Sequence, residues 1–313
     1  MASEKNIEAW IFWESLNSKI SLAPMVEMCD LPFRILVRKH CVNLCWTGMI
    51  NSNQWNMSKT YRNKIFQTND LDKPLVCQIS GSISSDIIRT AKDLSNFCCA
   101  IDINLGCCQK VAKRSQFGYF MVDTADKRVN VLNLLKNVVK EINVPLFVKM
   151  RMIDGDIKET VEFAKKVEET GVKLITIHGR TTEQDKNGNV NIDCISEIVK
   201  NTRIPIIANG GVKSLEEANE IMMKTGAAGV MVAQALLRNP VVFDKDCKMN
   251  QIEIAQEYIS LYKQYGNDFD ALRHHLFYIL DSELGDSNTK RSQLGTSHTV
   301  PELESFISTL AKS

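Results

Sequence analysis

Short runs of β-branched and other apolar residues alternate with longer amphipathic stretches along most of this chain of 313 residues. This alternation is typical of a parallel sheet whose strands are joined by crossover helices. Because most of the runs are almost continuously apolar, we expect both faces of each strand to be covered. The predicted strands are 20–25, 43–50, 75–80, 100–105, 145–151, 174–179, 205–210 and 229–234.

The number and spacing of these runs favour a closed barrel over an open sheet. Successive runs begin 23, 32, 25, 45, 29, 31 and 24 residues apart, and eight βα units are what a TIM barrel requires. The longest interval predicts an extra loop, 106–122, at the carboxyl end of the fourth strand. We therefore expect an α/β fold, with a TIM (β/α)8 barrel over 20–245 and an N-terminal extension over 1–19.

The strand pattern stops after Phe243. Segments 252–264, 270–284 and 301–311 have helical patterns, whereas 285–298 is polar and typical of a loop. These features predict a small C-terminal helical domain, 246–313, packed on the barrel. Residues 251–313 carry five bases and nine acids, a net charge of −4, so the rest of the chain carries +5. An anionic partner is therefore expected to meet the barrel mouth at least as much as this helical appendix.

The composition excludes several classes of protein. Hydrophobic residues make up 44% and charged residues 24%, as in ordinary globular proteins, and a formal net charge of +1 gives no global positive field. No apolar run reaches the roughly 18 residues of a membrane span. Ten cysteines without a secretory signal indicate a reducing compartment. Cys41 and Cys45 lack a second pair or clustered histidines, so no metal is expected. We expect a monomer in the cytoplasm, with the nucleus as the alternative.

Glycines follow the seventh predicted strand, at the place where TIM barrels often bind phosphate. Gly210 and Gly211 expose backbone amides, and a helix with a capping-box pattern begins near Ser214. The positive end of such a helix favours an anion. Although a Gly-Gly pair alone is more often a turn, this one stands beside other polar strand ends.

Other strand ends supply groups that suit the ring of a flavin mononucleotide. Lys149 suits the electron-rich N1/O2 edge of a reduced flavin, and Gln78 and His178 suit the polar edge of the ring. Pro24 and Met25 suit a rigid apolar backing. Each residue alone is more often structural, but together with the glycines they predict an FMN pocket.

Cys107 follows Gly106 directly after the fourth predicted strand. A free thiol has an ordinary pKa of about 8.5, so at neutral pH it is mostly protonated and acts as a proton donor to a carbanion-like atom. Opposite a flavin, this thiol is a candidate general acid for the reduction of a C=C bond. Two alternatives stay open, a buried structural cysteine and a nucleophile, although no acidic partner for a histidine is apparent nearby.

Five motifs, taken in order, resemble those of the tRNA-dihydrouridine synthases. They are Ser-Leu-Ala-Pro-Met at 21–25, Leu-Pro-Phe-Arg at 31–34, Asn-Leu-Gly-Cys at 104–107, His-Gly-Arg-Thr at 178–181 and Ala-Asn-Gly at 208–210. The resemblance runs from about residue 20 to 245 and includes the helical appendix. Segments 109–114 and 180–184 look most like the eukaryotic branch that acts at D-loop positions 16 and 17, and the branch that acts at 20a and 20b is the second choice.

This resemblance implies an FMN enzyme that reduces the C5–C6 double bond of a D-loop uridine in tRNA to 5,6-dihydrouridine. NADPH would reduce the flavin, the flavin would deliver hydride to C6, and Cys107 would protonate C5. Asn104 would hold the uracil edge, Arg180 would contact the substrate, and the appendix 246–313 would contact the tRNA. The implied flavin contacts are Pro24, Met25, Gln78, Lys149, His178, Asn209, Gly210, Gly211, Ala233 and Gln234.

Lys110, Lys113 and Arg114 form a short basic cluster in loop 106–122. Such a run is usually a solvated face. At the mouth of a barrel that modifies RNA we favour phosphate contacts, each of which would steepen the salt dependence of tRNA binding.

Some positions depart from the family pattern. Cys108 stands where proline normally follows the catalytic cysteine, and Gly211 stands where Asp or Asn is usual. Residues 234–235 are Gln-Ala in place of the frequent Arg-Gly, and Ser115 and Tyr119 replace small residues. We expect these departures to affect flavin affinity and loop closure and to leave the chemistry intact.

Two other functions stay open. An FMN-barrel oxidoreductase that acts on a small molecule would turn over without RNA. A barrel that has lost its flavin and only binds tRNA would be colourless.

Overall fold

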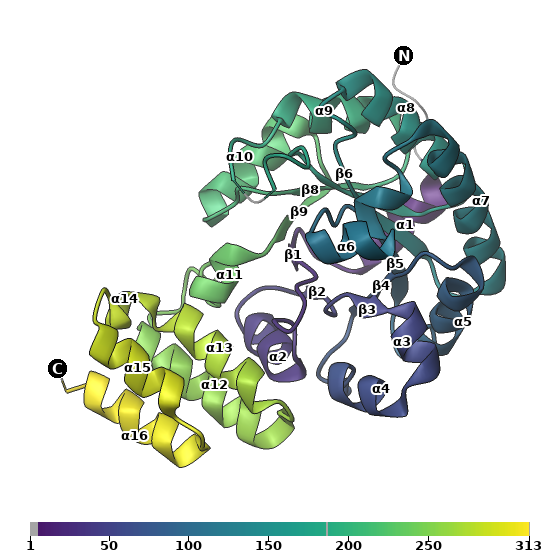
Figure 1. Cartoon of the computed structure of the whole chain (residues 1–313). Coiled ribbons are helices and arrows are strands. Elements are labelled where there is room, and N and C mark those ends of the chain that lie inside the picture. The colour runs from purple at the N-terminus through teal and green to yellow at the C-terminus, as the bar shows by residue number, and fades with distance from the viewer. Residues whose placement is uncertain (1–5, 186, 313) are drawn as a thin grey trace.

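Eight parallel strands form a ring at the centre of the computed structural model, which describes residues 6–185 and 187–312 (Figure 1). Each strand pairs with the next around the ring, and the pairs β1–β9, β1–β2 and β2–β4 close it. The predicted TIM barrel is therefore confirmed. Its strands are β1 (Ile20–Leu22), β2 (Leu44–Trp46), β4 (Leu75–Ser80), β5 (Ala100–Leu105), β6 (Leu146–Arg151), β7 (Leu174–His178), β8 (Ile206–Asn209) and β9 (Gly229–Val232).

The second predicted strand, 43–50, is interrupted. Strand β2 ends at Trp46, and β3 (Ile50–Asn51) pairs farther along the same neighbour, β4. Cys45 lies opposite Leu75 and Ile50 lies opposite Ile79, so five steps along this chain face four steps along β4. One extra residue therefore bulges out between β2 and β3, as β-bulges do near active sites.

Helices surround the barrel (Figure 1). Their ends follow local sequence signals: Ser214 accepts a hydrogen bond from the backbone of Glu217 as the cap of α10, and Gly226 ends that helix in the left-handed conformation. The helices between β1 and the end of the barrel are α2 (Leu31–Lys39), α3 (Ser52–Met57), α4 (Lys59–Ile65), α5 (Ser84–Leu94), α6 (Lys110–Ser115), η1 (Gly118–Met121), α7 (Ala125–Glu141), α8 (Ile157–Glu168), α9 (Ile192–Asn201), α10 (Leu215–Thr225) and α11 (Gln234–Arg238).

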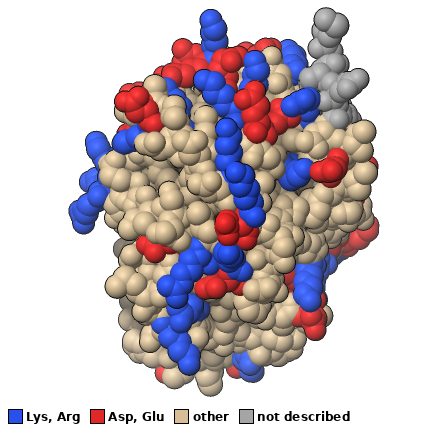
Figure 2. Space-filling model, turned by 90° about the vertical axis from the view of Figure 1, so that its right-hand side faces the viewer, with Lys and Arg blue, Asp and Glu red and all other residues tan. Residues whose placement is uncertain are grey.

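One face of the molecule, over α5, α7 and α8, carries lysine and arginine intermixed with aspartate and glutamate (Figure 2). Lys92 on α5, for example, pairs with Glu141 on α7 at 2.8 Å. This face therefore offers no single-sign patch to an anionic partner. Among the described helices, none is long and apolar enough to cross a membrane.

The interior of the barrel is apolar at one end. Trp46, Phe147, Leu174 and Met231 point inward there and form one buried cluster. Helix α1 (Ile7–Ser15), in the N-terminal extension, closes this end by adding Trp13 and other side chains to the cluster. The polar inward side chains consequently lie toward the opposite end, where the strands finish.

In the described part of the chain, five further helices follow the barrel and form a group that lies beside α2 and α11 (Figure 1). They are α12 (Gln251–Tyr265), α13 (Phe269–Ile279), α14 (Asp281–Leu284), α15 (Asn288–Thr296) and α16 (Val300–Leu310). Asp30, at the start of α2, accepts a hydrogen bond from the Tyr258 hydroxyl at 2.9 Å and pairs with the buried His275 at 3.1 Å. These contacts join the helical domain to the barrel.

The prediction of a loop over 285–298 was wrong, because α15 occupies most of it. Ser287 caps this helix by accepting a hydrogen bond from the backbone of Lys290, and Leu294 is its only buried residue. A helix that buries so little shows no apolar periodicity in the sequence.

Candidate active site at the barrel mouth

Polar side chains from neighbouring strands meet at the carboxyl end of the barrel. In the strand register Asn104 lies beside Lys149, and His178 lies beside Asn209. Gln78 lies beside Asp102 one strand away. Side chains that are paired in register point to the same side of a sheet. The structure thus brings the predicted strand-end residues into one mouth.

Asn104 and Gln78 hold each other and the start of loop 106–122. The Asn104 Oδ1 accepts hydrogen bonds from the backbone of Gly106, at 3.1 Å, and of Cys107, at 3.0 Å. Its Nδ2 donates to Gln78 Oε1 at 2.9 Å. The side-chain oxygen of Asn104 is therefore occupied, and only one Nδ2 hydrogen is left for a ligand.

Asp102 belongs to the site although it was not among the predicted site residues. Its Oδ2 accepts from Gln78 Nε2 at 2.7 Å and from Trp46 Nε1 at 3.0 Å, and its side chain is buried. Burial raises the pKa of Asp102 to about 7, against the opposing effects of its hydrogen bond to Gln78 and the charge of Lys149. Asp102 stands two residues before Asn104 in the run Ala-Ile-Asp-Ile-Asn-Leu, and this alternation was the signal that both point inward.

Lys149 and His178 have lowered pKa values. Burial and the charge of Arg151 lower the pKa of Lys149 to about 8, while Asp102 opposes the shift. Burial, together with Lys149, Arg151 and Arg180, lowers the pKa of His178 to about 2. The Arg180 guanidinium donates to His178 Nε2 at 3.2 Å, so the imidazole is neutral with its proton on Nδ1. The cations make this mouth suited to an electron-rich or anionic ligand.

Arg151 connects two loops at the mouth. Arg151 is the last residue of the predicted strand 145–151 and was not among the predicted site residues. The buried guanidinium donates from Nε to the Gly106 carbonyl at 3.2 Å and from Nη1 to the carbonyls of Thr181, at 2.7 Å, and Asp185, at 3.0 Å. Arg151 therefore fixes loop 106–122 relative to the loop after β7.

Loop 106–122 folds back on itself at Cys107. Cys107 is partly exposed, and its backbone carbonyl accepts a hydrogen bond from the backbone N–H of Tyr119 at 3.0 Å. Gly118 has a φ of +64°, and a Cβ atom at this position would lie 2.6 Å from the Cys107 oxygen and 2.9 Å from the Cys107 Cβ. Only glycine allows this approach.

Gly118→Ala is therefore expected to displace Cys107, the expected general acid, and to lower the rate of the expected uridine reduction. Both the clash and the positive φ oppose an alanine, and a displacement of about 1 Å at a reacting group costs on the order of 100-fold in rate. Gly155→Ala is the matched control, because Gly155 has a φ of +74° but its Cβ would make only an ordinary contact at 3.4 Å. Equal rates for the two variants would show that the close approach of Gly118 is unimportant.

The glycines after β8 form a turn against His178. Gly210 has a φ of +113°, and a Cβ there would lie 2.9 Å from His178 Cδ2 and 3.0 Å from a methyl group of Val190. Gly211 follows with a φ of +81°. The backbone therefore passes close to the mouth just before the N-terminus of α10, an arrangement that suits a phosphate group. Asn209 donates from Nδ2 to the Met231 carbonyl at 2.9 Å, which ties this turn to β9.

A family model described as dihydrouridine synthase (Dus) matches residues 21–295. The chain belongs to the dihydrouridine synthase family. Its relatives include a human tRNA-dihydrouridine(20a/20b) synthase [NAD(P)+]-like protein, 34% identical over 83% of this chain and 81% of that protein. A tRNA-dihydrouridine(16/17) synthase of Schizosaccharomyces pombe is 28% identical over 98% of this chain and 80% of that protein. The predicted family and its eukaryotic relatives are thus confirmed, and relatives of both position classes match.

Solved structures support the fold alone. A variant of NCR from Zymomonas mobilis has a TM-score of 0.53 at 10% identity, over 83% of this chain and 94% of that one. A morphinone reductase mutant in complex with tetrahydroNAD has a TM-score of 0.51 at 7% identity, over 72% of this chain and 85% of that one.

Two departures from the dihydrouridine synthase pattern make contacts within the loops. The Cys108 sulfur lies 3.8 Å from the Thr182 carbonyl and 3.6 Å from Asp185 Oδ1, so it faces the loop after β7. The Tyr119 hydroxyl donates to Asp154, whose backbone donates back to it at 3.2 Å. Both residues link loop 106–122 to its neighbours.

The remaining predicted residues lie at the rim. Lys110, Lys113 and Arg114 are exposed on α6, which lies over the mouth in Figure 1, and among the described residues none of them takes part in an ion pair. Pro24 and Met25, after β1, are half-buried. The eighth strand ends at Val232, two residues earlier than predicted. Ala233 is consequently the cap of the short helix α11, and Gln234 is exposed on its first turn.

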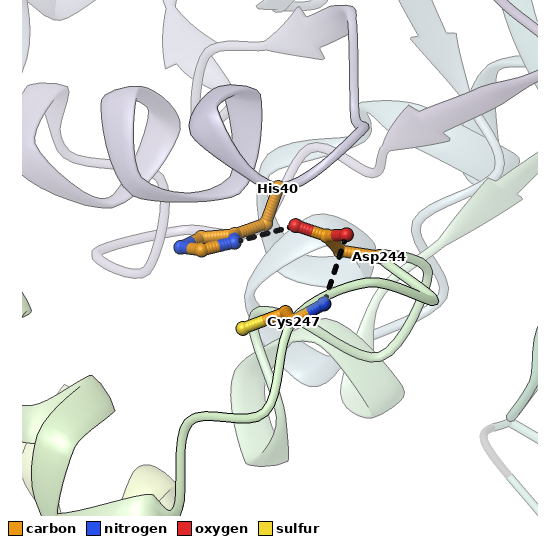
Figure 3. A group of neighbouring side chains, drawn as sticks. All are labelled: His40, Asp244 and Cys247. Atoms are coloured by element: carbon orange, nitrogen blue, oxygen red, sulfur yellow. Dashed lines mark hydrogen bonds and ion pairs between the residues drawn. The ribbon is translucent and has the colours of Figure 1, made fainter.

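Outside the mouth, a group of side chains of the kinds that bind metal ions is formed by His40, Asp244 and Cys247 (Figure 3). Their ligand atoms lie within 4.8 Å of one another. However, His40 Nδ1 lies 3.0 Å from Asp244 Oδ2, and its Nε2 lies 3.1 Å from Glu257 Oε2. Carboxylates thus occupy both ring nitrogens, and we interpret the cluster as a junction between α2, the segment before α12, and α12 itself.

Proposed function

We propose that this chain is an FMN-dependent tRNA-dihydrouridine synthase that reduces the C5–C6 double bond of a D-loop uridine, with NADPH as the reductant. The observation that carries the proposal is a partly exposed thiol, Cys107, held at the mouth that Lys149 and His178 line. The names of the relatives, which specify tRNA, dihydrouridine and NAD(P)+, support the substrate and the reductant.

The residues of the mouth fit FMN. The turn at Gly210 and Gly211 presents backbone ahead of α10 for the phosphate, and Lys149 offers a positive charge to the ring. Gln78 keeps one Nε2 hydrogen and His178 keeps its Nδ1 proton as donors to polar ring atoms. When bound and reduced by NADPH, FMN would supply a hydride to C6 of the base. Gln234 is exposed and uncharged, so the expected phosphate site lacks the positive charge that an arginine at this position would supply.

Cys107 then completes the reduction. Its thiol gives a proton to C5 as C6 is reduced, so each of the two carbons gains one hydrogen, and the resulting thiolate regains a proton from solvent. Asn104 holds the backbone of Cys107 and directs its remaining Nδ2 hydrogen toward a carbonyl oxygen of uracil, because its own oxygen is occupied.

RNA contacts explain the charges at the rim. Lys110, Lys113 and Arg114 on α6 face solvent and suit phosphates. Arg180 is half-buried beside His178 and suits a contact with the substrate at the mouth, and the helical domain extends the surface beside it. A target uridine must leave its stack to reach the mouth, which is easier in a loop than in a duplex.

Incubation of an unmodified tRNA transcript with the protein, FMN and NADPH tests this proposal. Nucleoside mass spectrometry should detect a uridine that has gained two hydrogens, and mapping of its position separates 16/17 from 20a/20b. An unmodified tRNA together with efficient reduction of a small enone would favour the small-molecule oxidoreductase instead.

A further inference from the structure

A continuous series of hydrogen bonds, buried up to its last link, runs from the interior of the barrel to the backbone of Cys107. It passes from Asp102 through Gln78 and Asn104 to the Gly106 and Cys107 amides, with every distance between 2.7 and 3.1 Å. Asp102, Gln78 and Asn104 are all at most 8% exposed. Water therefore has little access to replace a lost partner, and a broken link is costly.

The direction of each bond is fixed by the two ends of the chain. At the mouth, backbone N–H groups only donate, so the side-chain oxygen of Asn104 must face them and its nitrogen must face Gln78. The Gln78 amide consequently presents its oxygen to Asn104 and its nitrogen to Asp102. From the other side, the indole of Trp46 also only donates. Gln78 and Trp46 thus both donate to the same atom of Asp102, and this atom must be an acceptor.

We propose that Asp102 is a positioning residue, whose side-chain oxygen accepts from Gln78 and thereby orients the two amides that hold Cys107 at the mouth. The site role of Cys107 rests on the proposed function, whereas the orientation of the amides does not. A single oxygen, Oδ2, receives both donors, and Oδ1 has no hydrogen-bond partner in the described part of the chain. One oxygen that accepts from both donors suffices, and the carboxyl group offers such an oxygen in either protonation state, so the role requires an acceptor and not a negative charge.

Substitutions at Asp102 distinguish the effect of the acceptor oxygen from the effect of the shape of the side chain. Asp102→Asn keeps a carbonyl oxygen for Gln78 and Trp46, whereas Asp102→Leu keeps the branched shape without any acceptor. Thr176→Val is the matched control. Thr176 lies on β7, two residues after the inward Leu174, and its buried hydroxyl has no partner among the described residues.

Hydrogen exchange of the Gly106 and Cys107 amides, measured by mass spectrometry on the flavin-free protein, tests this series of hydrogen bonds directly. We expect Asp102→Leu to speed exchange of these two amides by about tenfold, the usual effect of one buried hydrogen bond. Asp102→Asn and Thr176→Val should leave exchange unchanged. Asn104→Ala, which removes the acceptor itself, is the positive control. If Asp102→Leu does not fold, Gln78→Met breaks the same chain one link later and should give the same acceleration.

Unchanged exchange in a folded Asp102→Leu or Gln78→Met variant would overturn the proposal, and so would equal acceleration in Asp102→Asn. The outcome is independent of the proposed function. If the exchange pattern is as expected but the unaltered protein reduces no tRNA, the positioning role stands and the proposed reaction fails. If the protein does reduce tRNA, uridine reduction should fall in Asp102→Leu and recover in Asp102→Asn.

Discussion

Cys107→Ala is expected to lower the rate of uridine reduction by about 100-fold or more, the usual contribution of a positioned general acid. Cys108→Ala should leave the rate close to that of the unaltered protein, because the Cys108 sulfur faces Thr182 and Asp185. The measurement is single-turnover formation of dihydrouridine by protein whose flavin has been reduced beforehand.

Flavin reduction by NADPH, followed separately, is the control for Cys107→Ala. This step does not require a proton donor to uridine C5, so it should proceed in both cysteine variants. A rate of uridine reduction in Cys107→Ala that equals the unaltered rate, with Cys108 intact, would refute the assignment of the general acid. Loss of activity in Cys108→Ala alone would transfer the role to the neighbouring thiol.

Asp72→Ala is expected to destabilise the fold by about 3–5 kcal/mol, the usual cost of leaving one charge of a buried pair without its partner. Arg34 and Asp72 are 3% and 0% exposed, and the guanidinium bonds to both carboxylate oxygens, at 3.1 Å from Nε to Oδ1 and 2.6 Å from Nη2 to Oδ2. Arg38 adds a contact from its Nε to Asp72 Oδ1 at 3.3 Å. The free energy of unfolding in urea is the quantity to compare.

Asp70→Ala is the matched control, two residues away. Asp70 pairs with Lys73 at 2.8 Å, but both side chains are largely exposed, so the pair contributes little. We expect its unfolding midpoint to match that of the unaltered protein. If Asp72→Ala also kept that midpoint, Arg34 would not depend on its buried partner. The presence of Arg34 in the motif Leu-Pro-Phe-Arg would then need an explanation other than its ion pair with Asp72.

The barrel could be predicted from the sequence because its strands are buried on both faces. Strands β4 and β5 have the predicted bounds, since each is a run of six buried residues. The break between β2 and β3 was invisible, because it depends on register against β4 and not on local composition. Helix α15 was missed for a related reason, since Leu294 is its only buried residue and its other contacts, such as Arg291 with Asp281 at 2.9 Å, are made by exposed or half-buried polar side chains.

The site could be predicted only in part. Residues that end a strand, such as Lys149 and His178, could be placed because the fold brings strand ends together. Asp102 and Arg151 were not predicted as site residues because their roles depend on the residues that they contact in the folded chain. Asp102 receives donors from two other strands, and Arg151 joins two loops that are about thirty residues or more from it in sequence. Such partnerships depend on tertiary structure, which spacing does not reveal.

The visible absorption spectrum of the purified protein with added FMN, followed through reduction and reoxidation, tests the proposed function most directly. We expect flavin bands that bleach with NADPH in the absence of oxygen and return faster when a uridine-containing tRNA transcript is added, together with formation of dihydrouridine. A protein that binds tRNA but takes up no FMN would contradict the proposed enzyme, as would a reduced flavin whose reoxidation is indifferent to tRNA.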